Sequence, residues 1–161
     1  LGLFRNALNL IGLVGQENLA AKLGRLELAE LIVPIPQSPE EIAFAEELAE
    51  TAVKTALLRH AGRIKYIYGP GGRMKIARGK DLTQIKYVIG TGGALTRLPR
   101  GRELLATARG CKDPTLLAPK AEAKVLLDHN YIMAAAGVLA RRYPEAATRL
   151  MLDSMALEGS I

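Results

Sequence analysis

The segment 87–95 limits the possible folds more than any other part of this sequence. Apolar residues lead into a glycine-rich cluster, and residues that suit the start of a helix follow. Glycine lacks a side chain and tolerates positive φ, so the backbone can turn sharply there and approach a ligand closely. The segment therefore predicts a strand, a tight turn and a helix start, and an α/β fold for the chain.

Two interpretations of this turn remain open from the residues alone. The N–H groups at the start of the helix could attract phosphate or other polar ligand atoms, or the turn could simply connect a strand to a helix. No Gly-Lys-Ser/Thr follows the glycines, which excludes a Walker A loop, and the Rossmann spacing of three glycines is not met. A hydrolase is not indicated either, because the sequence has no Gly-x-Ser-x-Gly motif.

The clearest helix is predicted from Pro39 to about His60. Ser38 suits the N-cap, Pro39 the first helical position, and Glu41 the third position of a capping box. Gly62 is expected to end this helix.

The residues before this helix are predicted to form a separate helical segment. Residues 1–31 are expected to be helical with breaks at Gly12, Gly15 and Gly24, and prolines make residues 32–36 extended. Residues 1–37 are therefore interpreted as a helical segment and a linker to an upstream part, and residues 38–161 as one lobe. The chain starts with leucine and not methionine, so we expect a piece of a longer protein.

Alternating residues after this helix predict a β-hairpin. Ile64, Tyr66 and Tyr68 share one face of the first strand, a cluster of glycines and a proline makes the turn, and a second short strand follows. Residues 85–89 are expected to add a third strand to the same small sheet. Because the two tyrosines have the same parity as Ile64, they are expected to point into the core.

The remainder is expected to be mostly helical. A helix is predicted over residues 94–108, interrupted by Pro99 and Gly101, and a short strand over residues 125–127. Asp128 is explained as the N-cap of a helix through Arg142 rather than as a catalytic acid. A last helix is predicted from Pro144 to about residue 156.

Composition excludes several classes of protein. With 161 residues, 49% of them hydrophobic, the chain can bury a core. No uncharged apolar run reaches the roughly 18–20 residues that a membrane span needs. The single Cys111 cannot form an internal disulfide, which favours the cytoplasm. His60 and His129 lie outside any Cys/His cluster, so a zinc site is not expected.

Positive charge is concentrated in the middle of the chain. From Arg59 to Lys112 there are 13 lysines and arginines but only two acidic residues, Asp81 and Glu103, within a total net charge of +6. This region could bind a polyanion or could simply be solvated. Basic residues and tyrosines alternate in the hairpin, which suits nucleic acid, but tyrosines that point into the core would not stack on bases.

Four segments resemble one known family. They read RHAG at 59–62, GKDLT at 79–83, YVIGTGGALTR at 87–97 and LDHNYIMAAAGVL at 127–139. These segments are similar, in this order, to the MutL/GlmL family, and the similarity extends from Ser38 to Met155. The family accompanies adenosylcobalamin-dependent glutamate mutase and related aminomutases, and is unrelated to the mismatch-repair protein of similar name.

The resemblance implies membership of the superfamily of actin, sugar kinases and heat-shock chaperones. In that fold two lobes close over ATP and Mg²⁺, and a glycine-rich turn of the C-terminal lobe packs on the adenosine end. By motif, the turn falls on Gly90, Thr91, Gly92 and Gly93. The chain would be the C-terminal lobe, a small sheet with a hairpin, covered by helices, and would carry half of a nucleotide site.

The same resemblance implies a function for the full-length protein. It would be an ATP-dependent accessory protein, a reactivating or assembly chaperone, for an adenosylcobalamin-dependent mutase. Its partners would be that mutase and the other lobe of its own chain, which supplies the phosphate grip and metal ligands. By itself this part is expected to be inactive and to hold no cofactor tightly. The alternatives are a small-molecule kinase of the same superfamily and a basic nucleic-acid-binding module.

Overall fold

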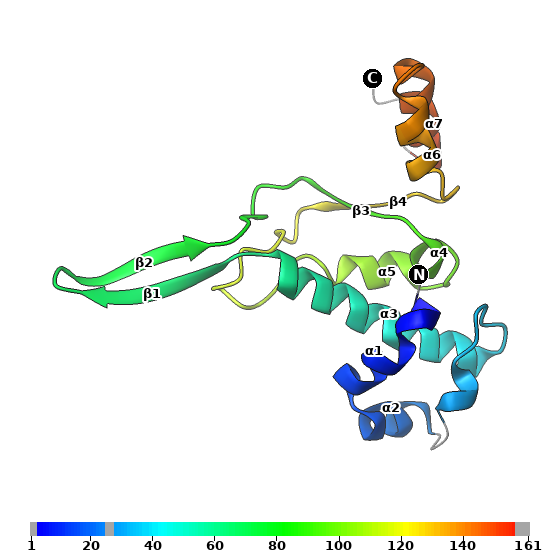
Figure 1. The fold of residues 1–161 in the computed structure, drawn as a ribbon, viewed down its shortest axis with the longest axis horizontal. Coiled ribbons are helices and arrows are strands. Elements are labelled where there is room, and N and C mark those ends of the chain that lie inside the picture. The colour runs from blue at the N-terminus through cyan, green and yellow to red at the C-terminus, as the bar shows by residue number, and fades with distance from the viewer. Residues whose placement is uncertain (1–2, 25–27, 157–161) are drawn as a thin grey trace.

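The computed structural model describes residues 3–24 and 28–156. Its helical elements are η1 (Leu3–Asn6), α1 (Ala7–Val14), α2 (Gln16–Leu23), η2 (Ala29–Leu31), α3 (Pro39–His60), α4 (Gly93–Thr96), α5 (Gly101–Ala106), α6 (Met133–Leu139) and α7 (Pro144–Ser154). Its strands are β1 (Arg63–Gly69), β2 (Gly72–Arg78), β3 (Tyr87–Gly90) and β4 (Lys124–Leu127). The chain is therefore a mixed α/β protein, as the sequence predicts, with the N-terminal helices, α4 and α5 packed against α3 (Figure 1).

Helix α3 starts where its capping residues predict. The Ser38 hydroxyl accepts from the Glu41 amide at 3.2 Å, and the Glu41 carboxylate accepts from the Ser38 amide at 3.1 Å, which completes the capping box. The helix ends at His60 with Ala61 in an extended conformation. The helix thus ends just before Gly62, as the sequence predicts. Gly62 is also required because a Cβ there would lie 2.7 Å from the Gly79 carbonyl carbon.

The N-terminal helices pack directly on α3. Leucines of α1, α2 and η2 form one hydrophobic cluster with Phe44 and Leu48 of α3. The chain turns at Gly15 and Gly24, which have φ of +89° and +64°. The expected break at Gly12 was wrong, because this residue lies within α1 and continues the helix.

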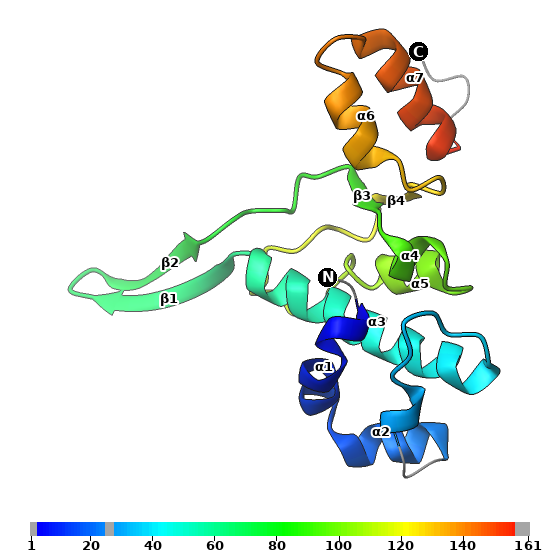
Figure 2. The same cartoon turned by 45° about the vertical axis from the view of Figure 1, so that its right-hand side comes forward.

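The strands form two separate sheets, which corrects the prediction of one small sheet. β1 and β2 pair antiparallel as the expected hairpin, whereas β3 pairs in parallel with β4. Leu105 of α5 packs with Val125 and Leu127 on one face of the β3–β4 pair. The hairpin extends away from the other elements in both views (Figures 1 and 2).

The expectation that helices cover the hairpin and that its tyrosines point into a core was also wrong. Tyr66 is 45% exposed and Tyr68 79% exposed, and Ile67 on the opposite face is exposed as well. Alternation of side chains gives a strand two faces, but burial of either face needs a layer packed against it. In the described part of the chain, no such layer covers the hairpin.

The two short helices after β3 replace the single interrupted helix of the sequence prediction. α4 and α5 are separated at residues 97–100, where the Arg100 amide donates to the buried carboxylate of Glu46 in α3 at 2.9 Å. The break requires Gly101, since a Cβ there would lie 1.8 Å from the Leu95 carbonyl oxygen. The hydrogen bond between Arg100 and Glu46 holds the segment after β3 against the middle of α3.

The C-terminal elements agree with the sequence in kind and differ mainly in the length of α6. β4 and α7 lie where they were predicted, and α6 is shorter than the expected helix from Asp128 to Arg142. α6 and α7 pack together as an antiparallel pair beyond the end of β4 (Figure 2). Within residues 3–24 and 28–156, no helix has the length and apolar character of a membrane span.

Candidate functional site

An open cleft of about 960 Å³ lies between α1, α3 and the turn that follows β3. Residues from four separate parts of the sequence line it, three of which supply most of the lining. The turn contributes Thr91, Gly92 and Gly93, the N-terminal segment contributes residues between Leu3 and Leu13, and α3 contributes residues between Ala49 and Arg59. The cleft therefore lies at the carboxyl end of β3, where α/β folds commonly bind ligands.

The glycines of the turn leave the backbone open to this cleft. Gly92 has φ +97°, and a Cβ built on Gly92 or Gly93 would meet no atom within 4 Å. In the described structure, the amide N–H groups of these two glycines donate to no other residue. A ligand in the cleft could thus approach the backbone closely and accept hydrogen bonds from it.

Gly90, the first of the four residues predicted from the motif, has a different position. It is buried below the turn and is not among the residues that line the cleft. A Cβ there would lie 2.5 Å from a methyl carbon of Leu105 and 3.0 Å from one of Leu127. The structure thus places Thr91, Gly92 and Gly93 at the cleft and gives Gly90 a packing role beneath them.

The α3 wall combines small apolar side chains with one cation. Ala52, Val53 and Ala56 leave room above the helix, and Arg59 in its last turn is the only charged residue among those that line the cleft. Arg59 has no ion-pair or hydrogen-bond partner among residues 3–24 and 28–156. The cleft therefore offers an apolar floor and an unpaired positive charge.

Tyr131 borders the same cleft from the segment between β4 and α6. Its φ is +54°, which is uncommon for a residue other than glycine. Its amide donates to the Asp128 carbonyl oxygen at 2.9 Å, which stabilises this tight turn. Such backbone strain often accompanies a ligand-binding site, and here it places an aromatic side chain at the edge of the cleft.

A buried carboxylate connects the glycine turn to the C-terminal helices. Asp128, which is 0% exposed, accepts a hydrogen bond from the Thr91 hydroxyl at 2.9 Å. It also accepts from the amides of Ile132 and Met133, at 3.1 and 2.8 Å, and from the Ser154 hydroxyl at 2.5 Å. One side chain therefore joins the turn, the start of α6 and the end of α7.

These contacts determine the ionisation of Asp128. Burial raises the pKa of its carboxyl group, but the hydrogen bonds from Ser154, the two amides and Thr91 outweigh burial and lower the pKa to about 2. The group is therefore an anion at neutral pH that accepts from every donor around it. A carboxylate held in this way has a structural role and is not available as a general base.

The sequence revealed only part of this arrangement. The prediction that Asp128 is the N-cap was wrong, because α6 begins at Met133 with Ile132 at its N-cap, but the Asp128 carboxylate accepts from the amides of both residues at the start of that helix. Its bonds to Thr91 and Ser154 were missed. Because parallel strands end at the same edge of a sheet, the positions of Thr91 after β3 and Asp128 after β4 could have indicated their contact, had the pairing of these strands been foreseen.

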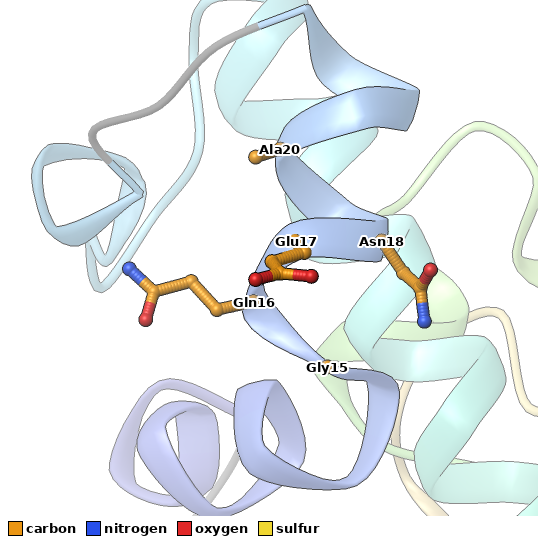
Figure 3. Close-up of a pocket in the computed structure, with 5 residues that line it drawn as sticks. All are labelled: Gly15, Gln16, Glu17, Asn18 and Ala20. Carbon is orange, nitrogen blue, oxygen red and sulfur yellow. The ribbon is translucent and has the colours of Figure 1, made fainter.

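A second hollow lies at the corner between α1 and α2, and its side chains do not converge (Figure 3). Gln16 points away from Asn18, and the Asn18 amide group donates to the Val14 carbonyl oxygen within the corner itself. Across the described ranges, no three His, Cys, Asp or Glu side chains gather as they would around a metal ion. The cleft above the glycine turn is therefore the stronger candidate site.

Comparison with known proteins identifies the family. The family described as MutL protein matches residues 1–155, which is nearly the whole chain. The chain belongs to the MutL family. Protein MutL of Clostridium tetanomorphum is 40% identical to it over 124 residues, which are 76% of this chain and 27% of the relative. No solved structure matches the chain.

The family assignment confirms the resemblance seen in the sequence motifs. This MutL-family chain spans about a quarter of the length of the curated relative that it matches.

Proposed function

We propose that this MutL-family chain is the nucleotide-binding C-terminal part of an ATP-dependent accessory protein. The full-length protein would reactivate or assemble an adenosylcobalamin-dependent mutase, such as glutamate mutase or an aminomutase. The observation that carries the proposal is the open cleft above Thr91, Gly92 and Gly93, whose backbone is accessible from the cleft. The MutL family supports the link to the mutase system.

The cleft has properties that suit the adenosine end of ATP. Its volume of about 960 Å³ lies within the range of small-molecule sites, which combine apolar walls with a few polar groups. Ala52, Val53 and Ala56 could pack against a base, and the amides of Gly92 and Gly93 could donate to it or to the ribose. Arg59 adds a cation that could stack on the base or attract a phosphate.

The remaining parts of an ATP site would come from elsewhere in the full-length protein. The residues that line the cleft include no carboxylate that could hold Mg²⁺ and no lysine that could grip a phosphate. In an actin-like fold these groups belong to the other lobe, so we infer that the full-length protein binds ATP with Mg²⁺ between two lobes. Hydrolysis, if it occurs, needs both lobes.

The proposed mechanism is a change of lobe closure. ATP would favour the closed state because it contacts both lobes, and ADP would favour it less. If the mutase binds the two states with different affinity, each nucleotide cycle could open the mutase and release a damaged cofactor. This action, in the cytoplasm, would be that of a chaperone rather than of a catalyst of cobalamin chemistry.

The test uses the full-length protein with Gly92→Val and the control Gly71→Val. Calorimetry with ATP and Mg²⁺ should show binding by the wild type, and Gly92→Val should weaken it about tenfold or more, or about 1.4 kcal/mol. Gly71, in the hairpin turn, also has open space around it, so its variant should bind normally. Equal binding by all three proteins would contradict the nucleotide site.

The accessory role needs a second measurement. A cobalamin-dependent mutase inactivated by a damaged cofactor should recover activity with the full-length protein and ATP, but not with the protein alone. ATP-dependent phosphorylation of a small molecule, without recovery of the mutase, would favour the kinase alternative.

A further inference from the structure

The β1–β2 hairpin forms an arm, residues 63–78, that projects from the end of α3 (Figures 1 and 2). Its register places directly paired residues on the same face. One face carries Ile64, Tyr66, Tyr68, Arg73, Lys75 and Ala77, and the other carries Arg63, Lys65, Ile67, Met74, Ile76 and Arg78. The two faces therefore have different chemistry: one is aromatic with two cations, and the other, the apolar face, combines three adjacent apolar side chains with three cations.

All charged residues of the arm are basic. From Arg63 to Lys80 the chain has six lysines and arginines and no acidic residue. The ion pair at its base, Arg63 with Asp113 at 2.8 Å, neutralises only the first of them. Four cations along the arm, Lys65, Arg73, Lys75 and Arg78, and Lys80 just beyond it thus have no carboxylate partner among residues 3–24 and 28–156.

The apolar face is exposed to an unusual degree. Ile67 is 42% exposed, Met74 50% and Ile76 43%, and the three lie next to one another across the two strands. An isolated two-stranded hairpin is marginally stable in water, and contiguous exposed apolar side chains usually mark an interaction site. The arm therefore has the features of a surface that another macromolecule covers.

The base of the arm is fixed to the body. The Ile64 amide donates to the Thr115 carbonyl oxygen at 2.7 Å, and the Gly62 amide donates to the Lys80 carbonyl oxygen at 2.7 Å. Gly62 and Gly79 cross so closely that neither could carry a side chain without a backbone shift. These contacts fix the orientation of the arm relative to the body of the protein. Docking of the arm would therefore cost less conformational entropy.

We propose that the arm docks into a partner protein, in an apolar groove bordered by carboxylates. Ile67, Met74 and Ile76 would enter the groove, and the cations at the edges of the arm would pair with the acidic border. This inference rests on the proposed function, because the partner that we assign to the arm is the mutase that the accessory protein serves.

The apolar face favours a protein over a nucleic acid. Ile67, Met74 and Ile76 gain nothing from a phosphate backbone, and burial of such side chains is the main source of protein–protein affinity. On the other face, the Arg73 guanidinium lies 3.6 Å above the centre of the Tyr66 ring and already occupies one side of it. Tyr68 is then the arm tyrosine whose ring is free for bases to stack on. Proteins that bind single strands stack successive bases on several aromatic rings, so one free ring is too few.

The experiment measures binding of the full-length protein to the purified adenosylcobalamin-dependent mutase by surface plasmon resonance. The variants are Lys65→Glu/Lys75→Glu, which reverses charge on the arm, and Ile67→Ser, which disrupts its apolar face. Arg141→Glu/Arg149→Glu is the matched control, with the same charge change at exposed positions of the C-terminal helical pair. Circular dichroism verifies that each variant folds.

We expect both arm variants to weaken binding by roughly tenfold or more, and the control to change it less than about twofold. Charge reversal should slow association and remove its salt dependence, and Ile67→Ser should speed dissociation. Trypsin should cut the arm at Arg73 and Lys75 in the free full-length protein, and bound mutase should protect these sites.

The possible failures can be distinguished. Wild-type protein that does not bind the mutase would overturn the proposed function and the arm proposal together. Normal binding by both arm variants would overturn the arm proposal alone. Trypsin resistance of the arm in the free protein would show that another part of the same chain covers it. Arm-dependent binding to single-stranded DNA or RNA that persists at ~150 mM salt would instead identify a nucleic-acid module.

Discussion

The Thr91 hydroxyl and the Asp128 carboxylate are joined by a hydrogen bond of 2.9 Å, although they lie 37 residues apart in the sequence. Thr91 follows β3 and Asp128 follows β4, and the two strands are parallel neighbours. The Asp128 amide also donates to the Gly90 carbonyl oxygen at 2.9 Å. The glycine turn is thus attached to the neighbouring strand through both a side chain and the backbone, which fixes its position at the cleft.

Loss of the Thr91 hydroxyl should loosen the turn. We expect Thr91→Val to lower the free energy of unfolding by about 1–2 kcal/mol, because the variant keeps the shape but removes one donor from a buried carboxylate. Thr91→Ser retains the hydroxyl and should be close to wild type. Urea denaturation of the three proteins is the measurement, and equal midpoints for valine and serine would show that the bond has little energetic role.

Acid should destabilise the protein through Asp128. The folded-state pKa of about 2 lies below the ordinary value of 3.8. The contribution of this group, ~2 kcal/mol, is therefore present above pH 3.8 and is lost as the pH falls toward 2. Asp128→Asn should be less stable at pH 7 and should lose less stability between pH 4 and 2. Parallel curves of unfolding free energy against pH for the two proteins would rule this out.

The 161-residue chain alone should bind ATP weakly and show no significant hydrolysis. The cleft offers backbone amides and Arg59, but its lining residues include no carboxylate for Mg²⁺, and phosphoryl transfer depends on metal and phosphate contacts. Isothermal calorimetry and a phosphate-release assay test this expectation. Micromolar affinity or clear turnover would mean that the described residues form a complete site.

Two glycine substitutions should have opposite effects on stability. Gly101→Ala places a Cβ 1.8 Å from the Leu95 carbonyl oxygen, so we expect a loss of roughly 1–3 kcal/mol. Gly137→Ala, in α6, meets no atom within 4 Å and should gain ~0.5–1 kcal/mol, because alanine favours a helix. Both changes in the free energy of unfolding are measured by chemical denaturation. If Gly101→Ala leaves this free energy unchanged, the close approach of Gly101 to the Leu95 carbonyl oxygen is disproved.

Elements with strong local signals could be predicted from the sequence. The capping residues from Ser38 to Glu41 fixed the start of α3, and Pro144 fixed the start of α7. The glycine turn at the end of β3 was found because glycine has a distinct conformational role there. In each case the information lies within a few residues of the element itself.

Features that depend on distant pairing could not be predicted in this way. The partner of β3 is a strand more than 30 residues later, so the sequence suggested one sheet instead of two. The orientation of Tyr66 and Tyr68 depended on whether a layer covers the hairpin, which alternation cannot reveal. The bond from Asp128 to Ser154 likewise required the position of α7 to be known.

The close contact between Gly62 and Gly79 distinguishes positions at the base of the arm that must remain glycine from positions at its tip that can change. Neither residue has space for a Cβ at the base of the arm, whereas a Cβ on Gly71 at its tip would meet no atom within 4 Å. Insertions or exchanges at the tip would therefore leave the cleft and the core unchanged. Relatives of this chain could acquire arms of different length and charge, and so change partners, while the cleft evolves independently.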